Sequence, residues 1–251
     1  MDLRTGFRIL LGCVVLAAGG TAQVTPTSPA CPPLTADEIV TRLAQRNLER
    51  AEALPAYRST RTYRTQYRGF PGSRSAEMVV DVTFEPPGTK TFTVRSQTGS
   101  KLIIDRVFKK LLESEKEAAD PENQKRTALN GDNYAFTLTG CDAGGRPAFV
   151  LEVEPKVKSK FLYRGTIWVD AGDFAVTRIS AEPAKNPSFW IKHTQIEHAY
   201  VKVNDFWLPA TNRSATKVRL GGQAELFIEY GEYRLNGPAT ATGQENRTAR
   251  R

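Results

Sequence analysis

The sequence predicts a mainly β protein of the α+β class, built on one large, curved antiparallel sheet. Apolar and polar residues alternate along most of the chain, and glycine, asparagine and aspartate residues separate these segments at short, regular intervals. Only two longer segments have a helical period. About ten strands with so few helices predict a meander that is either closed as a barrel or left partly open, with helices on its concave side.

Residues 1–22 are predicted to be a cleavable signal peptide. Two arginines precede an apolar run over residues 9–18, and small residues follow it up to Ala22. We therefore expect cleavage before Gln23 and export to the periplasm. The run is far shorter than the ~20 apolar residues that span a bilayer, and no later stretch approaches that length, so we do not expect an integral membrane protein.

The segment Leu10-Leu11-Gly12-Cys13 imitates a bacterial lipobox, whose cysteine is acylated and becomes the mature N-terminus. The apolar run continues past Cys13 to Leu16, so cleavage before Cys13 would divide it. An ordinary secretory cut is therefore expected, and acylation at Cys13 is the alternative.

Cleavage before Gln23 leaves only Cys31 and Cys141 of the three cysteines. In an oxidising compartment, two cysteines favour one disulfide. This disulfide would join the segment before the first helix to the end of a strand in the middle of the chain. The alternative is a pair of free, buried thiols.

The chain is basic, with a formal net charge of +8. Asp2, Arg4 and Arg8 contribute +1 of this charge, which leaves +7 after cleavage. For an exported protein, the expected partner is an anionic envelope surface, such as phospholipid or lipopolysaccharide headgroups, and not nucleic acid. The alternative is that these charges are scattered and merely solvated.

After a Pro-rich linker, an amphipathic helix opens the predicted domain. Thr35 and Glu38 have the spacing of a capping box, and apolar residues recur at helical spacing up to Pro55. Such a helix has one face to bury. The predicted linker, domain and disordered tail comprise residues 23–34, 35–235 and 236–251.

A second helix is predicted from Ser100 to about Ala119, where apolar residues form one stripe. The polar segment 120–133 that follows has neither period. Because both are inserted between strands, they are expected to cover one face of the sheet. The cover is either movable or a crossover helix packed permanently against the sheet.

Strands account for most of the remaining chain, and consecutive strands are expected to pair. In the first of them, alternate residues from Tyr57 to Tyr67 share one face. The predicted strands are Tyr57–Arg68, a hairpin of Met78–Phe84 with Phe92–Ser96, Tyr134–Cys141, Ala148–Pro155, Leu162–Asp170, Phe174–Ala181, Phe189–Val203, Phe206–Ala210, Thr211–Arg219 and Ala224–Leu235.

No frequent catalytic signature, cofactor motif or metal site occurs in the sequence. His193 and His198, the only histidines, lie five residues apart in one predicted strand, so they point to opposite faces and cannot share a metal. No glycine-rich loop joins a strand to a helix, and Gly-x-Ser-x-Gly is absent. Glu152 and Glu154 share a strand face, but this spacing is common on solvated faces. We expect no enzymatic activity.

The C-terminal third resembles the outer-membrane lipoprotein-sorting proteins, the LolA/LolB-like periplasmic carriers. The residues that carry the resemblance are a strand that ends in Asp170 and a strand that ends in Arg178-Ile179, followed by Pro183–Trp190 and by Trp207-Leu208-Pro209. The resemblance extends over residues 35–235 and is strong from residue 162 onward.

This resemblance implies an unclosed β-barrel whose mouth is covered by helices, with an apolar cavity that receives acyl chains. It also implies transport of lipoproteins towards the outer membrane without catalysis. The family has a lid arginine near its early strands, but no arginine here matches a motif, so none is assigned. Related domains sense envelope stress, so a regulatory or scaffolding role without transfer is the alternative.

The expected partner is a lipoprotein acyl chain or another lipid, held by a monomer without a cofactor; envelope proteins are further expected partners. Trp168, Trp190 and Trp207 either line the cavity or belong to the core, and the core is favoured because aromatic residues dominate cores. Strand alternation and the second helix give the expected lining of the cavity: Val80, Val82, Phe84, Phe92, Val94, Phe108, Leu111 and Leu112.

Overall fold

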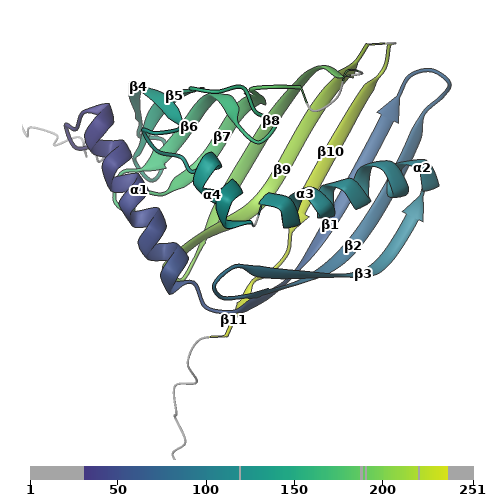
Figure 1. Cartoon of the computed structure of the whole chain (residues 1–251), viewed down its shortest axis with the longest axis horizontal. Coiled ribbons are helices and arrows are strands. Elements are labelled where there is room, and N and C mark those ends of the chain that lie inside the picture. The colour runs from purple at the N-terminus through teal and green to yellow at the C-terminus, as the bar shows by residue number, and fades with distance from the viewer. Residues whose placement is uncertain (1–30, 119, 187–188, 190, 220, 237–251) are drawn as a thin grey trace, which may run out of the picture.

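The computed structural model describes residues 31–236, except 119, 187–188, 190 and 220 (Figure 1). The predicted signal peptide with Cys13, most of the linker and nearly all of the tail lie outside the described residues. The elements are α1 (Ala36–Ala53), β1 (Tyr57–Arg68), β2 (Arg74–Glu85), β3 (Thr89–Gly99), α2 (Lys101–Ile103), the π-helical segment η1 (Ile104–Phe108), α3 (Lys109–Ala118), α4 (Pro121–Thr127), β4 (Tyr134–Asp142), β5 (Ala148–Pro155), β6 (Tyr163–Asp170), β7 (Val176–Pro183), β8 (Ile191–Val203), β9 (Phe206–Val218), β10 (Gln223–Tyr230) and β11 (Arg234–Leu235).

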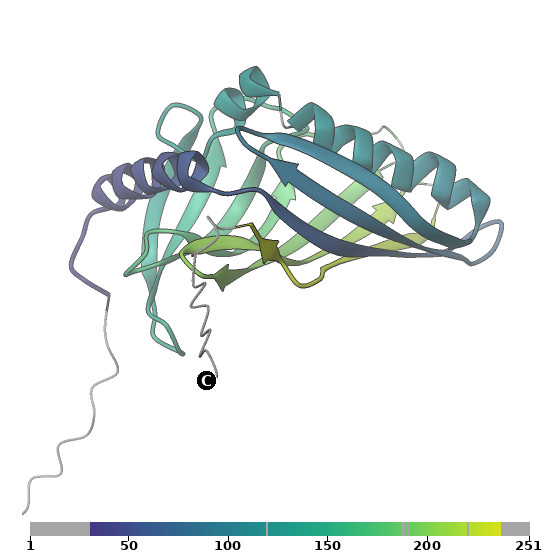
Figure 2. The same ribbon diagram turned by 90° about the horizontal axis from the view of Figure 1, so that it is seen from below.

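One antiparallel sheet contains every described strand, in the order β3-β2-β1-β10-β9-β8-β7-β6-β5-β4, with β11 paired to β1. Because β1 pairs with β10, the consecutive strands β3 and β4 lie at opposite edges of the sheet. These two described edges do not pair, so the sheet is not closed. Figure 2 shows it curving beneath the helices. The predicted fold class, a mainly β protein with an unclosed, curved sheet covered by a few helices, is confirmed.

The concave face can be followed across the sheet, because residues paired in an antiparallel sheet point to the same side. The predicted face of β1 belongs to it, since Tyr57, Ser59, Arg61, Tyr63 and Thr65 are all buried. From β2 to β5, successive pairs on this face are made by Met78, Tyr63, Ile228, Asn212, His198, Ile179, Ile167 and Leu151.

Helix α1 covers one end of the concave face. Its predicted capping box is present: the amide of Glu38 donates to Thr35 Oγ1 at 3.3 Å, and the amide of Thr35 donates to Glu38 Oε2 at 2.8 Å. Ile39, Val40 and Leu43 are buried in a cluster with residues of β4 to β7, which we call the α1 core. Burial of one apolar stripe thus fixes this helix on the sheet.

The segment from α2 to α4 connects β3 to β4, so it has to cross the concave face from one edge towards the other (Figure 1). Its first part packs on β1 and β2, where Ile103 and Phe108 are buried beside Tyr63 in what we call the α2 core. Among the described residues of α3 none is buried, although Leu111 and Leu112 pack partly against the α2 core.

The polar segment 120–133 contains the helix α4, which was not predicted because the segment has no apolar period. Asp120 caps this helix, because its carboxylate accepts hydrogen bonds from the amides of Glu122 and Asn123 at 3.0 and 3.3 Å. Proline at the first helical position needs no amide partner there. Local capping defines a helix this short, so a search for an apolar stripe misses it.

Two strand predictions are wrong. Phe206–Ala210 and Thr211–Arg219 form the single strand β9. Ala199 lies opposite Thr211 and Tyr200 lies opposite Pro209, so Ala210 is an extra residue that forms a bulge in β9. Proline, which has no amide hydrogen to donate, is tolerated at such a bulge because the ladder of hydrogen bonds is interrupted there. Ala224–Leu235 is divided into β10 and β11 at Gly231. The amide of Gly231 donates to Thr60 O at 2.7 Å, and a Cβ there would lie 2.8 Å from that oxygen.

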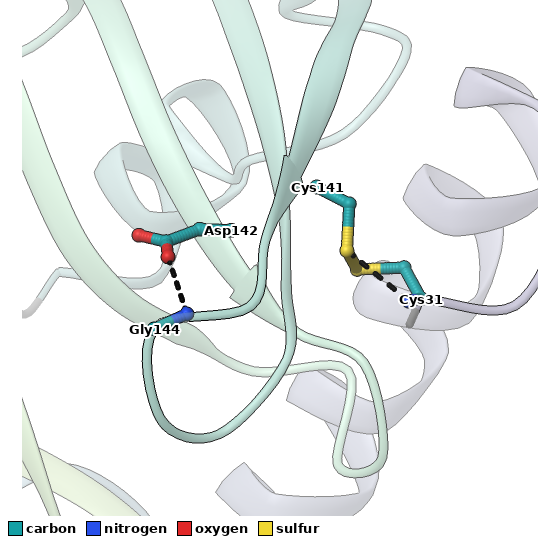
Figure 3. The surroundings of a disulfide bond; sticks show 4 residues. All are labelled: Cys31, Cys141, Asp142 and Gly144. Atoms are coloured by element: carbon teal, nitrogen blue, oxygen red, sulfur yellow. Dashed lines mark hydrogen bonds between the residues drawn. A yellow bond between two sulfur atoms is a disulfide. The ribbon is translucent and has the colours of Figure 1, made fainter. Parts of the chain in front are cut away.

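The predicted disulfide between Cys31 and Cys141 is present (Figure 3). The two Cα atoms are 5.9 Å apart, and the bridge closes a loop of 110 residues in sequence separation. It ties the segment before α1 to the end of the edge strand β4. The bridge therefore links the α1 cover to the sheet covalently.

Reduction of this disulfide should destabilise the fold by up to about 4 to 5 kcal/mol, because it restores the conformational entropy of a long loop to the unfolded chain. The measurement is the melting temperature with and without dithiothreitol, and of the double variant Cys31→Ser/Cys141→Ser. The double variant should melt like the reduced protein and should not respond to dithiothreitol. Two thiols that react with maleimide in the native, non-reduced protein would contradict the bridge.

Candidate functional site

A cavity of about 750 Å³ lies at the centre of the concave face, between α3 and the strands β8, β9 and β10. The α1 core fills the face over β4 to β7, and the α2 core fills it over β1 and β2. Among the described residues, neither core contains a fully buried residue of β8 or β9. The cavity is therefore the part of the concave face that the two helical covers leave unfilled.

Small side chains on the floor create this space. The floor contains Thr194, Ser214, Thr216 and Ala224, which are shorter than the residues beneath the two helical covers. Other floor residues are Ile196, His198, Asn212, Leu226, Ile228 and Tyr230. The wall on the helical side contains Val107, Leu111, Ser114, Glu115 and Ala118, and the opposite wall contains Lys160, Phe161 and Pro183.

The floor is partly polar, but its central hydroxyls already have a partner. Thr194 and Thr216 lie on paired strands, and their Oγ1 atoms are 3.0 Å apart, so one hydroxyl donates to the other. An apolar guest above them would not leave these two groups without a hydrogen bond. The floor thus accepts apolar groups at a lower cost than its composition alone indicates.

A buried ion pair joins the sheet to the cover at the edge of the cavity. The Arg61 side chain of β1 is 2% exposed, and its Nη1 lies 2.6 Å from Oε2 of Glu115, a residue of α3 that is 27% exposed. The hydroxyl of Tyr63 donates to the same carboxylate at 3.2 Å. The guanidinium also lies 4.7 Å from the ring centroid of Tyr230. Since α3 has no buried residue, this pair is its strongest polar anchor.

The charges around the ion pair determine the protonation states near the cavity. Burial opposes the charge of Arg61, but the combined effects of Glu115, Tyr63 and Tyr230 keep the pKa of Arg61 above its ordinary value. Burial lowers the pKa of Lys90. Glu115 opposes this decrease, and Arg61 adds to it. Lys90 lines the cavity, and among the described residues its ammonium forms no hydrogen bond or ion pair within 4 Å.

His198 points into the cavity from β8 and is neutral at neutral pH. Burial lowers the pKa of its ring to about 4; Glu115 opposes this decrease, and Arg61 adds to it. The ring stacks on Tyr200 at 4.5 Å, and its Nδ1 lies 3.5 Å from Asn212 Nδ2. Its Nε2 is buried and has no partner among the described residues.

Most of the predicted lining residues gather on the concave face, but beside the cavity. Of the eight, only Leu111 lines the central cavity. Val80, Val82 and Phe108 are fully buried in the α2 core, against which Phe92, Leu111 and Leu112 pack partly. Phe84 lies in a separate cluster with Tyr57. Val94 is 43% exposed on the edge strand β3. That these eight residues contact a ligand remains a prediction.

The other candidates from the sequence lie away from the cavity. His193 is half-exposed and pairs with Glu182 at 3.2 Å, so it does not share a site with His198. Glu152 accepts a hydrogen bond from the hydroxyl of Thr166 at 2.7 Å on the convex face. The indole of Trp207 donates to Asp173 at 3.0 Å, and Arg178 stacks 4.5 Å from the ring centroid of Trp168; Trp190 lies outside the described residues.

Sequence reasoning did not single out Arg61, Glu115 or Lys90, and it considered His198 only as a possible metal ligand. The alternation of β1 contained one usable signal, because Arg61 falls on the same face as Tyr57 and Tyr63, and a charge on an aromatic face requires a buried partner. Glu115 belongs to a helix end rich in glutamate and lysine, where the sequence does not distinguish it from its solvated neighbours.

Replacement of Glu115 by glutamine should destabilise the protein by about 2 to 3 kcal/mol, because it leaves Arg61 buried without a counter-charge. Glu113→Gln is the matched control, since Glu113 is exposed on the same helix; its effect should be within about 0.5 kcal/mol. Urea denaturation measures both. Equal effects of the two substitutions would show that the ion pair does not hold the cover.

His198 should make the stability depend on pH between 6.5 and 4. Because its folded pKa of about 4 lies below the ordinary value of 6.5, the unfolded chain binds more protons in this interval. Its contribution is complete above pH 6.5 and falls, by up to about 3 kcal/mol, as the pH drops to 4.

The test compares urea denaturation of the wild type, His198→Phe and His193→Gln across this pH interval. His198→Phe retains a flat ring but cannot titrate, so its stability should fall less than that of the wild type. His193→Gln controls for the loss of a histidine from the same strand. Parallel curves for the wild type and His198→Phe would exclude His198 as the source.

No protein-family model and no curated protein matches the chain. Among solved structures, it is similar to a LolA superfamily protein from Nitrosomonas europaea, with 11% identity and a TM-score of 0.34 over 82% of this chain and 95% of that chain.

The chain is also similar to an outer membrane lipoprotein-sorting protein domain from Vibrio parahaemolyticus, with 15% identity and a TM-score of 0.38 over 84% of this chain and 95% of that chain. A third similar structure is the MucA/MucB complex of Pseudomonas aeruginosa, with 12% identity and a TM-score of 0.24 over 81% of this chain and 99% of that chain. The LolA-like lipoprotein-sorting proteins, which the sequence resembles, are thus among the structures similar to this chain.

Proposed function

We propose that this protein is an exported, non-catalytic carrier that holds an acyl chain of a lipoprotein, or another lipid, in the central cavity. The observation that supports the proposal is the cavity of about 750 Å³ between α3 and the floor of β8 to β10. Its size lies in the range of about 300 to 1,000 Å³ that is typical of small-molecule sites. Its walls contribute Val107, Leu111 and Phe161, and its floor contributes Ile196 and Leu226.

Burial of an acyl chain supplies enough free energy for useful affinity. Each CH₂ group moved from water into an apolar site contributes about 0.8 kcal/mol, so about 16 groups contribute about 13 kcal/mol before the cost of ordering the chain. Net affinities in the micromolar range follow from about 8 kcal/mol. A chain that fills most of the cavity reaches this range.

The cover has features of a movable element. Among its described residues α3 buries no side chain. It is held by partial packing of Leu111 and Leu112 and by the ion pairs Arg61–Glu115 and Lys160–Glu117. Weakly packed elements open at low free-energy cost, while the sheet and α1, which is tied by the disulfide, remain folded. In the carrier proposed here, outward movement of α3 admits the lipid and its return shields the acyl chain from water.

The proposed location is the periplasm. The Cys31–Cys141 disulfide requires an oxidising compartment. None of the helices in the described part of the chain is both long and apolar enough to cross a membrane. The signal peptide that the sequence predicts, with cleavage before Gln23, is the proposed means of export.

Filling the cavity from its floor should prevent lipid uptake without loss of folding. In Thr216→Trp, a large ring projects from the floor into the cavity. In Lys217→Trp, the same ring projects from the exposed convex face of the same strand. The first variant should bind a fluorescent fatty acid at least about tenfold more weakly than the wild type, and the second should bind like the wild type.

Circular dichroism and melting temperatures establish that both variants are folded. Mass spectrometry of lipids extracted from the purified wild type identifies the natural cargo. Equal uptake by the two variants would place the lipid elsewhere. Failure of the wild type to bind or co-purify with any lipid would favour the regulatory or scaffolding role instead.

A further inference from the structure

One end of the sheet brings together segments that are distant in the sequence. Arg68 at the end of β1 pairs with Gln223 at the start of β10, and the same end contains the pairs Ile191–Val218 and Tyr163–Pro183. Figure 1 shows the β1–β2 turn, the β9–β10 turn and α2 together at the upper right. We call this end the basic rim; it comprises the described residues of 68–74, 101–106, 128–133, 156–161, 185–192 and 219–222.

The basic rim exposes large apolar side chains. Phe70, Phe189, Val157 and Leu102 are 87%, 72%, 61% and 51% exposed, and each belongs to a different rim segment. Outside the rim, Leu48 of α1 is the only large apolar side chain of the described residues that is more than half exposed. Single exposed apolar residues are common, but four at one end of a molecule indicate an interaction surface.

The same rim is strongly cationic. Its acidic residues among the described segments are Asp105, which pairs with Lys109 at 2.7 Å, and Asp132. Its exposed cationic residues are Arg68, Arg74, Lys101, Arg106, Lys156, Lys158, Lys160, Lys185, Lys192 and Arg219. The turns at the opposite end of the strands are acidic and contain Glu85, Asp142, Asp170, Asp173, Asp205 and Glu232 beside Arg146. Charge is therefore distributed unequally along the strand direction.

A groove of about 440 Å³ in the rim lies between the β1–β2 turn and the start of the cover. Phe70, Pro71 and Leu102 line it together with Arg74 and Arg106. It shares three lining residues with the central cavity, namely Thr65, Val107 and Ala224. The groove and the cavity are thus neighbours on the concave side of the sheet.

We propose that the basic rim docks on an anionic lipid bilayer, with Phe70 and Leu102 inserted among the acyl chains and the surrounding arginine and lysine side chains at the headgroups. Exposed apolar tips that are ringed by cations match both layers of such a surface, whereas an acidic protein would complement the charge and leave the apolar tips in water. Docking in this orientation turns the groove, and the cavity behind it, towards the membrane. The docking does not depend on whether the cavity holds a lipid.

The experiment measures co-sedimentation of the purified protein with two kinds of vesicle. One is phosphatidylcholine alone, and the other is phosphatidylcholine with a minority of phosphatidylglycerol. The wild type should bind the anionic vesicles, bind neutral vesicles far more weakly, and be released by high salt because the cationic contacts are screened.

Two variants separate the apolar and the cationic contributions. Phe70→Ser/Leu102→Ser and Arg74→Gln/Arg106→Gln should each lower binding to anionic vesicles by at least about tenfold. Leu48→Ser, which removes an apolar side chain of similar exposure from α1, is the matched control and should bind like the wild type. Since all five residues are exposed, the variants should keep the melting temperature of the wild type.

Absence of binding to anionic vesicles would overturn the proposal. Binding that is lost in Arg74→Gln/Arg106→Gln but unchanged in Phe70→Ser/Leu102→Ser would also overturn it, because the rim would then be a site for an acidic macromolecule. Uptake of a fluorescent fatty acid from solution is measured in parallel. Docking-deficient variants should retain it, so failure of docking and failure of the carrier function are distinguishable.

Discussion

The pairing of β1 with β10 determines the arrangement of the whole molecule. Because of this pairing, β1, β2 and β3 extend the sheet beyond β10. The strands β3 and β4 therefore form opposite edges of the sheet, although they follow one another in the chain. The connection between them has to span the width of the sheet. The helical part of this connection has an apolar stripe that needs an apolar partner. It finds this partner on the concave face, where Ile103 and Phe108 are buried, so the connection covers that face.

The distribution of side-chain volume over the concave face explains why the centre is hollow. Under the two helical covers, the sheet presents large residues such as Phe149 and Met78, which interlock with α1 and with the α2–η1 segment. Beneath α3 the sheet presents threonine, serine and alanine, and α3 itself is polar enough to remain partly solvated. Stability is thus concentrated at the two ends of the sheet, and the middle strands are free to form a binding surface.

Much of this fold was predictable, because α1, β1 and the hairpin of β2 and β3 each follow one clear period with clear caps or turns. The disulfide was predictable because the predicted cleavage leaves only two cysteines. The strand boundaries around Pro209 and Gly231 were not, since they depend on a bulge at Ala210 of β9 and on the approach of Thr60 O to Gly231. The central cavity could not be located from the sequence for a related reason. Alternation identifies which residues point inward, but only the three-dimensional packing decides that Val80 and Phe108 are filled core while Thr216 and His198 face open space.

An unclosed sheet has two free edges, and a free edge can recruit a strand from another molecule. Both outermost strand pairs contain a register shift, between Val79 and Val80 in the β2–β3 pair and between Leu138 and Gly140 in the β4–β5 pair. A bulge bends the edge and interrupts the row of unpaired amide and carbonyl groups that a second chain would need. Charged and polar side chains such as Arg95 and Gln97 further disfavour stacking along β3. The open sheet is therefore combined with local protection against edge-to-edge aggregation.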